Sequence, residues 1–287
     1  MFWLILSLLT ALFTNLRDIT SKKSLEKVDV YTASFSGIFF TLPFLLPLLF
    51  FIEIPKIGTL FFPTLIIAAV LYAASYILYS KALSTSDISV TVPMASFTPA
   101  FMLITSPILI NELPNTLGII GVLLGFLGSY VLNIRELHKG FFEPFKALLR
   151  GSGPRLMLIV AFIWSIAANL DKIGLQNSSP IFWLIANNMA IAAVMLPIML
   201  HKSTGGVKGI RTNLKWLLPI GLSAALMSIT FMLAINTTLV AYVISIKRLI
   251  IVFGVIAGYM VFGEKNIKER LIGSIIMIIG VLLITLS

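Results

Sequence analysis

Two adjacent basic residues, Lys247 and Arg248, lie near the middle of an apolar stretch that runs from 238 to 262. Each costs about 2.5 to 3.5 kcal/mol at the centre of a membrane helix, so both heads must face a bundle interior or a water-filled cavity. Tyr242, Ser245 and Arg248 recur at intervals of three and share one helical face. The cluster predicts a binding site for a carboxylate or phosphate, which Arg grips with two hydrogen bonds. The alternative is an internal salt bridge to an acidic residue of another helix.

Four asparagines lie inside apolar stretches, where a side-chain amide needs a hydrogen-bond partner. Asn15 and Asn169 occupy matching places in the two halves of the chain, and Asn187 and Asn188 lie in the middle of the segment 180–200. Each is a candidate for contact with a bound substrate. The alternative is that they form hydrogen bonds between helices.

Two charged pairs also occupy matching places in the halves, with the order of charge reversed. Arg17 precedes Asp18, whereas Asp171 precedes Lys172. If the halves have opposite orientations in the membrane, the two pairs lie towards opposite faces. We expect ion pairs near helix ends, and the alternative is a set of gating contacts that open in turn.

Glu112 and Glu264 each close an apolar segment where the chain turns. This position predicts a structural role such as helix capping, and proton coupling is the alternative. Pro93, Pro99 and Pro107 lie in the segment that Glu112 closes. Proline bends a helix and frees a backbone carbonyl, which a membrane bundle tolerates when a neighbouring group bonds that carbonyl. We therefore assign Pro93 and Pro99 a structural role.

Residues for catalysis or for metal binding are scarce. The chain has no Cys, and its two histidines, His138 and His201, lie between apolar segments. A histidine metal site within the membrane is therefore not expected. The chain also lacks a phosphate-binding P-loop, so ATP-driven transport by this chain alone is not expected. We predict no catalytic residues, no metal, no cofactor and no enzymatic activity.

The composition indicates that membrane helices position these residues. Of the 287 residues, 59% are hydrophobic and 11% are charged, and the mean hydropathy is +1.05. Soluble proteins carry about 25% charged residues, so most of this surface must face lipid. The net charge of +10 indicates cytoplasmic loops and anionic headgroups rather than nucleic acid. Residues 2–14 resemble the apolar part of a signal peptide, but their basic residues follow the apolar run, so we expect a membrane helix.

Ten apolar segments are long enough to cross a bilayer, which takes about 20 residues. They cover 2–21, 30–52, 59–81, 87–111, 115–134, 155–175, 180–200, 214–235, 238–262 and 267–286. We predict an all-α integral membrane protein with ten transmembrane helices. A first five-helix repeat covers 1–134, an interfacial linker covers 135–154, and a second five-helix repeat covers 155–287.

The repeats follow from an internal match at a nearly constant offset. Shifting the second half by 152 residues pairs ALSTSDISVTVPM (82–94) with AINTTLVAYVISI (234–246) and continues for about fifty residues. Within that stretch the matched pairs include Glu112 with Glu264, Gly121 with Gly273 and Gly128 with Gly280. Because each half has an odd number of spans, the halves must be inverted relative to each other, as in many secondary transporters.

These features resemble the EamA-type transporters of the drug/metabolite transporter superfamily. The resemblance rests on the five-plus-five layout, on the acidic residue closing the fourth segment of each half (ILINELP, MVFGEKN), and on VISIKRLIIVFGVIAGYMVFGEK at 243–265. The W-G-x-x-(F/Y) pattern often seen early in such proteins is reduced here to Trp3 and Trp164, and Asn111 stands where a Gly is usual. The resemblance implies uptake or efflux of a small metabolite.

We expect a secondary transporter in the cell membrane that works by alternating access, with its site between the two repeats. The alternatives are an intramembrane enzyme acting on a lipid-phosphate substrate and a non-transporting membrane scaffold. The expected partners are the lipid bilayer and a small metabolite, anionic if Lys247 and Arg248 bind it. No nucleic-acid partner is expected, and the chain is expected to be a monomer or a homodimer.

The basic residues are distributed unequally between the two sets of connections. Connections after the odd-numbered segments hold sixteen Lys and Arg residues, whereas the opposite set holds only Lys56 and Lys172. Cytoplasmic loops are enriched in Lys and Arg, so we expect both termini on the extracytoplasmic side.

Overall fold

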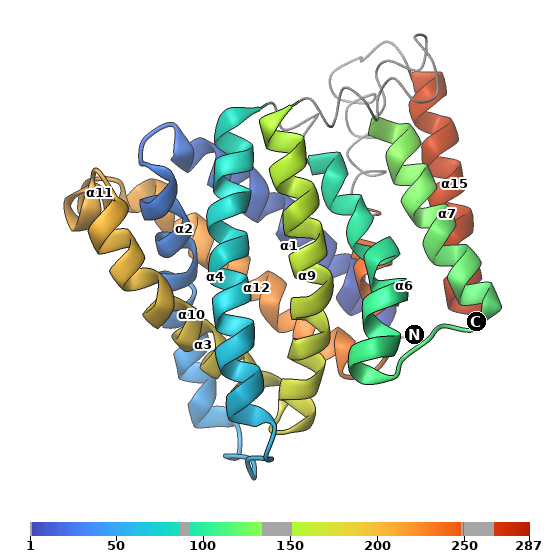
Figure 1. Cartoon of the computed structure of the whole chain (residues 1–287), viewed down its shortest axis with the longest axis horizontal. Helices are drawn as coiled ribbons and strands as arrows, with labels where there is room; N and C mark the ends of the chain where they lie inside the picture. Colours follow the sequence, from blue (N-terminus) through green and yellow to red (C-terminus); the bar gives the residue numbers. More distant parts are fainter. Residues whose placement is uncertain (1, 87–91, 134–150, 248, 250–266) are drawn as a thin grey trace.

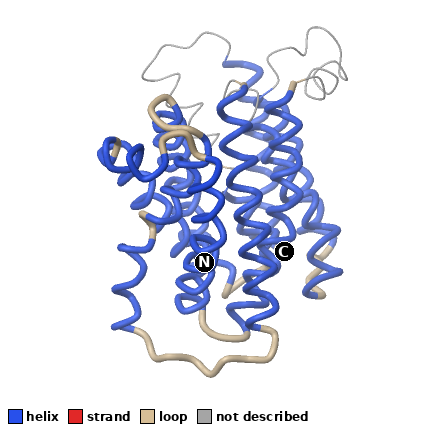
Figure 2. The backbone as a smooth tube through the Cα atoms, turned by 60° about the vertical axis from the view of Figure 1, so that its left-hand side comes forward, coloured by secondary structure: helices blue, strands red, loops and turns tan. Residues whose placement is uncertain are grey.

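The chain folds into helices that lie side by side (Figures 1 and 2). The computed structural model describes residues 2–86, 92–133, 151–247, 249 and 267–287. The helices of the first half are α1 (Phe2–Leu25), α2 (Val30–Phe39), α3 (Leu42–Leu45), the 3-10 helix η1 (Leu46–Phe51), α4 (Phe61–Thr85), the 3-10 helix η2 (Val92–Ser96), α6 (Phe97–Ile110) and α7 (Thr116–Asn133). Those of the second half are α9 (Ser152–Gln176), α10 (Pro180–Lys202), α11 (Gly206–Thr212), α12 (Leu214–Ile235), α13 (Val240–Lys247) and α15 (Ile267–Leu286).

Six segments are long and apolar enough to cross a membrane: α1, the run from α2 to η1, α4, α9, α10 and α12. Shorter apolar helices cover Met94–Ile110, Thr116–Gly128 and Ile272–Leu286. Each of these coincides with a segment predicted from the sequence, so the prediction of an all-α protein with several apolar spans is confirmed. The ninth predicted segment, 238–262, is described only at 238–247, which include α13, and at 249.

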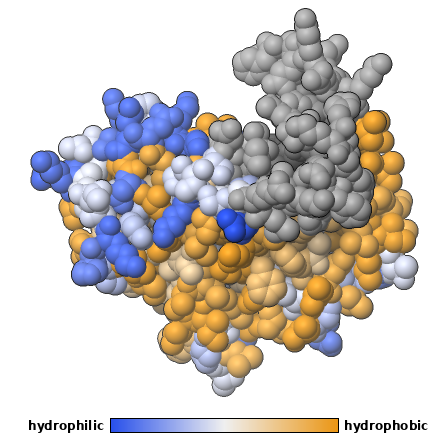
Figure 3. Space-filling model, turned by 45° about the horizontal axis from the view of Figure 1, so that its top comes forward, coloured by the Kyte–Doolittle hydropathy of each residue, from blue (hydrophilic) through white to orange (hydrophobic). Residues whose placement is uncertain are grey.

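The outer surface of the bundle is apolar. Large side chains such as Phe50, Ile66 and Ile108 are exposed on different helices. Figure 3 shows a broad hydrophobic surface, with hydrophilic residues gathered towards one end. Soluble monomers rarely expose apolar patches of this extent, whereas a bilayer requires them.

The strongest packing joins helices of different halves. The first helix of each half packs against the third helix of the other half, since α1 lies on α12 and α9 lies on α4. The fifth helices, α7 and α15, pack against each other. Exchanging the halves leaves this pattern unchanged, as a two-fold relation requires. The contacts therefore agree with the repeats expected from the internal match.

The contacts between glycines of α7 and α15 show the same two-fold relation between the halves. A Cβ atom on Gly121 would lie 2.6 Å from the carbonyl oxygen of Gly280, and one on Gly128 would lie 2.6 Å from that of Gly273. In the internal match Gly121 corresponds to Gly273 and Gly128 to Gly280. Equivalent glycines thus exchange partners between two antiparallel helices, which is the contact pattern of an isologous interface.

A tight turn after α6 brings an acidic residue back towards the second half. Asn111 ends α6 with φ 54° and ψ 31°, in the left-handed region. Asn adopts this conformation more readily than most residues, which explains why it replaces Gly here. The turn directs Glu112 towards α9 and the start of α13.

Asp29 ties the halves together at the opposite, hydrophilic end of the bundle. Its side chain caps α2 by accepting from the backbone of Tyr31 and Thr32, and it also accepts from the hydroxyl of Ser203, which follows α10. Burial raises the pKa of Asp29, but the hydrogen bonds from Ser203 and Thr32 outweigh burial and hold the pKa below its usual value of 3.8. The carboxylate therefore stays ionised at neutral pH and keeps its capping role.

Candidate functional site

A cavity with about 700 Å³ of space lies between the two halves. Helices α1, α4 and α6 contribute its walls from the first half, and α9, α10, α12 and α13 contribute them from the second. Its polar and charged lining residues are Arg17, Tyr72, Tyr76, Thr98, Trp164, Asp171, Asn187, Asn188, Ser228 and Lys247. We refer to it as the central cavity.

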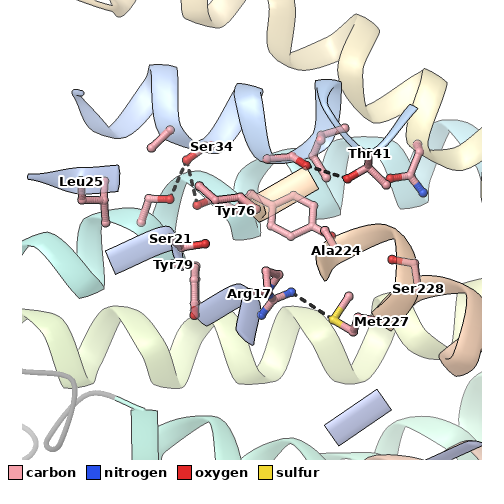
Figure 4. A pocket seen from close by; sticks show the side chains of 16 residues that line it. Arg17, Ser21, Leu25, Ser34, Thr41, Tyr76, Tyr79, Ala224, Met227 and Ser228 are labelled. Atoms are coloured by element: carbon pink, nitrogen blue, oxygen red, sulfur yellow. Dashed lines mark hydrogen bonds between the residues drawn. The ribbon is translucent and has the colours of Figure 1, made fainter. Parts of the chain in front are cut away.

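A second cavity, of about 550 Å³, adjoins the first (Figure 4). It extends between α1, α2, α4 and α12 towards Ser21, Leu25 and Ser80, near the hydrophilic end of the bundle. Five residues line both cavities: Arg17, Tyr76, Asn188, Met227 and Ser228. We call this second space the side cavity, and Arg17 lies where the two cavities meet.

The Arg17 guanidinium is buried but keeps one poorly satisfied nitrogen. Its Nε and Nη2 atoms donate to Asp18 Oδ1 at 3.1 and 2.8 Å. Its Nη1 atom contacts the Met227 sulfur at 3.4 Å, drawn in Figure 4, and the Tyr79 ring centroid lies 5.5 Å from the guanidinium carbon. The expected Arg17–Asp18 ion pair is therefore present. Because a thioether is a weak acceptor, Nη1 retains capacity for a stronger one.

Lys247 reaches the same sulfur atom from the other half of the chain. Its Nζ atom lies 3.9 Å from the Met227 sulfur and 5.7 Å from the Phe231 ring centroid. The structure thus brings Arg17 of α1 and Lys247 of α13 to a common point in the central cavity. Arg248 lies outside the described residues.

Asp171 lies in the wall of the central cavity and is almost fully buried. Its Oδ2 atom accepts from the Tyr72 hydroxyl at 2.5 Å. Its Oδ1 atom accepts from Trp183 Nε1 at 2.9 Å and from Asn187 Nδ2 at 3.1 Å. All three donors are neutral.

Lys172 points elsewhere and pairs with Glu112 at 2.5 Å. Its Nζ atom also donates to the carbonyl of Thr238 at 2.7 Å, and Glu112 Oε2 lies 3.5 Å from the amide nitrogen of Val240 at the start of α13. Asp171 and Lys172 therefore do not form the counterpart of the Arg17–Asp18 pair. Glu112 Oε2 does face the N-terminus of α13, where a carboxylate is favourable.

The other predicted site residues take different places. Asn188 lines both cavities and donates to the carbonyl of Leu184. Asn169 is buried among Ser106, Thr105 and Ser165, to which it is hydrogen-bonded, and lines neither cavity. Asn15 is exposed on α1 and also lies outside both cavities.

Tyr242 and Ser245 do not share the face of α13 that lines the central cavity. Tyr242 packs near Trp3 and receives a hydrogen bond from Ser287, and Ser245 bonds to the carbonyl of Ala241. Ile244 and Lys247 line the cavity instead.

Of the residues predicted to have a structural role, two prolines lie in described helices. Pro99 is buried in the first turn of α6, and Pro93 lies in η2. Glu264 falls outside the described residues. In the part of the chain that the structure covers, no group of three or more His, Asp or Glu side chains could hold a metal ion.

Several lining residues were not anticipated from the sequence. Tyr72 and Tyr76 belong to α4, and Met227, Ser228 and Phe231 belong to α12. The tyrosines carry a usable signal, because positions 72, 76 and 79 fall on one helical face within an apolar segment. Met, Ser and Phe are ordinary constituents of apolar segments, so those positions carry no comparable signal.

The comparisons with known proteins identify the family. A model of the EamA-like transporter family matches residues 1–134 and 151–286. The chain belongs to this family. The resemblance found in the sequence is thereby confirmed, and EamA membership points to a multi-pass membrane transporter and not to an enzyme.

The fold also occurs among solved structures. A crystal structure of a protein aligns with this EamA chain with a TM-score of 0.72, covering 99% of this chain and 96% of its own, at 13% sequence identity. At that identity the likeness concerns the fold alone. No curated protein matches the chain.

Proposed function

We propose that this protein is a secondary transporter in the cell membrane that carries a small anionic metabolite by alternating access. The observation that carries the proposal is the convergence of Arg17 and Lys247, from different halves, on one point of the central cavity. A substrate held by both would contact both moving parts of the molecule, as transport between inverted repeats requires.

The chemistry of that point favours an anion. Both cationic groups contact the Met227 sulfur, at 3.4 and 3.9 Å, and a thioether is a weak acceptor. A carboxylate or phosphate oxygen in the same place would form charge-assisted hydrogen bonds, which are stronger. An anion beside Arg17 Nη1 would therefore replace a weak contact with a stronger one, and Lys247 would add a second positive charge next to it.

The Lys172–Glu112 ion pair supports a gating role at one end of the cavity. Glu112 follows α6 in the first half, and Lys172 belongs to α9 in the second. Opening this end would separate the two side chains. In this proposal the pair closes the end of the bundle where α9 finishes, and it breaks when the cavity opens there.

Flux into proteoliposomes that contain only this protein tests the proposal, with amino acids, nucleosides, sugar phosphates and organic cations as candidate solutes. We expect flux of an anionic solute and a loss of about tenfold or more in Arg17→Met and in Lys247→Met, since a hydrogen bond to a charged group contributes about 1.5–3 kcal/mol. Lys56→Met, which removes an exposed lysine remote from both cavities, is the control. Flux that depends on neither Arg17 nor Lys247 would contradict the assignment.

A further inference from the structure

The carboxylate of Asp171 has no cationic partner among the described residues, although it lies in the interior of a membrane bundle. It is 1% exposed. The described part of the chain forms the ion pairs Arg17–Asp18 and Lys172–Glu112, and neither includes Asp171. A buried carboxylate without a counter-ion is costly in its ionised form, and an ionisable residue within a membrane bundle is a functional candidate by default.

The ionisable groups around Asp171 come from four helices. Helix α4 presents Tyr72 and Tyr76, α1 presents Arg17 with its partner Asp18, and α13 presents Lys247. On α9 itself, Lys172 is engaged by Glu112. The neighbouring helix α10 contributes only the neutral side chains of Trp183 and Asn187. Helices η2, α6 and α12 also pack against α9, and among the described residues they bring no ionisable side chain to the central cavity.

The hydrogen bonds determine where a proton binds. Oδ1 is held by the N–H groups of Trp183 and Asn187, which donate and do not accept. Oδ2 faces the hydroxyl of Tyr72, which both donates and accepts. A proton on Oδ2 is therefore accommodated when the Tyr72 hydroxyl turns from donor to acceptor.

The side-chain oxygen of Asn187, next to Asp171, lacks a hydrogen-bond donor among the described residues. Asn187 Oδ1 is buried and has no hydrogen-bond partner among the described residues, and Asn187 lines the central cavity beside Asp171. Buried carbonyl oxygens are rarely left without a donor. A water molecule in the cavity would satisfy this atom and would also deliver a proton to the neighbouring carboxylate.

We propose that Asp171 binds the proton that couples transport to a pH gradient, with the proton carried on Oδ2. The proposal rests on the transport function proposed above. The proton comes from water on the side to which the cavity is open and returns to water on the other side. Protonation removes one negative charge from a cavity that also holds Arg17 and Lys247, which strengthens the binding of an anion there. Proton and anion therefore move in the same direction.

Infrared difference spectra of the reconstituted protein, recorded between acid and alkaline pH, test the proton site without any substrate. We expect a carboxylic acid C=O band that is present at acid pH and lost at alkaline pH, and that shifts when the protein is made with heavy-carbon aspartate. The band should be lost in Asp171→Asn and retained in Glu53→Gln, which removes an exposed carboxylate between η1 and α4. The absence of a titrating, aspartate-specific band in the unaltered protein overturns the proposal, whatever the variants do.

Gradient-driven flux tests the coupling. With the outside acidic, the unaltered protein should accumulate the anionic solute in proteoliposomes, and Glu53→Gln should do the same. Asp171→Asn, which stays neutral at every pH, should lose this accumulation, and any exchange that remains should be independent of pH. Exchange that ignores the gradient in the unaltered protein overturns the coupling but leaves the transport function standing. Absence of all flux contradicts the transport function, while the infrared band still decides the proton site.

Discussion

The Lys172–Glu112 pair joins the two halves through partly and fully buried charges. The Lys172 side chain is 9% exposed and that of Glu112 is 19% exposed. Removing one member of such a pair leaves the other charge without compensation, which costs more than the pair itself contributes. The pair is therefore a sensitive point for the stability of this conformation.

We expect Lys172→Met to lower the free energy of unfolding by about 1–3 kcal/mol, because Glu112 then lies mostly buried without its cation. Adding Glu112→Gln should recover part of this loss, since the amide oxygen still faces the amide of Val240. Unfolding of the purified protein in detergent measures both. Losses that simply add in the double variant would show that the two side chains are not coupled.

The same residues show what the sequence can reveal about a site. Asp171 and Lys172 are adjacent, so a local pair resembling Arg17–Asp18 was a reasonable expectation. Successive residues of a helix point about 100° apart, however, and here one side chain enters the central cavity while the other meets Glu112. The side-chain partners of Asp171 lie between 12 and 99 residues away in sequence, and only the packing of α9 against other helices selects them.

At the scale of the helix, the spacing of polar residues identifies the face that lines a cavity only when the other faces are known to contact lipid or packed protein. Lys247 was expected in the site and does line the cavity, but together with Ile244 and not with Tyr242 and Ser245. Because α13 is buried on all sides, every face of it contacts protein, and spacing alone does not say which face borders the cavity.

The second apolar segment illustrates a related limit. Hydropathy predicts one span over 30–52, and the structure divides it into α2, α3 and η1. Pro43 and Pro47 lie at the starts of α3 and η1, where the missing N–H costs nothing. The length of an apolar segment can thus be predicted from the sequence. The point at which proline interrupts the helix depends on local backbone geometry.

The pairing of α7 with α15 makes a prediction about two glycines four residues apart. A Cβ on Gly121 meets backbone atoms of Gly280 and Ile284, which are not free to move aside, whereas a Cβ on Gly125 meets nothing within 4 Å. We expect Gly121→Ala to destabilise the protein by about 1–3 kcal/mol through separation of the helices. Gly125→Ala should be neutral or stabilising by up to about 1 kcal/mol. Unfolding of the two variants in detergent measures their free energies of unfolding. Equal losses in both variants would contradict the close approach of α7 to α15 at Gly121.

At the scale of the whole molecule, the internal match at a nearly constant offset predicts which helices are equivalent but not how they pack. Equivalence follows from duplication, which leaves a record in the sequence. The exchange of partners between α1, α12, α4 and α9 depends on how the two halves dock. Apolar side chains suit many such interfaces, so the sequence does not select one.

The distribution of charge between the two ends of the bundle predicts its orientation. The described basic residues of the hydrophilic end are Lys22, Lys23, Lys27, Lys81, Arg155, Lys202, Lys208, Arg211 and Lys215, together with Lys268 and Arg270 in the first turn of α15. At the other end Lys172 is buried against Glu112, which leaves Lys56 as the exposed basic residue of the described part. The termini lie at this second end, where Asn115 bonds to Ser287 and Trp3 packs near Tyr242. The positive-inside rule therefore predicts that both termini lie outside the cytoplasm.

Single cysteines test this orientation cleanly, because the chain has none of its own. Glu53→Cys and Thr204→Cys lie on opposite ends, are exposed, and leave the number of basic residues unchanged. In intact bacterial cells an impermeant maleimide should label Glu53→Cys, whereas Thr204→Cys should react only after the cells are opened. A carboxy-terminal GFP fusion should be dark, since GFP seldom matures outside the cytoplasm. The reverse labelling pattern together with a bright fusion would place the basic end outside, and loops other than those counted would then have to set the topology.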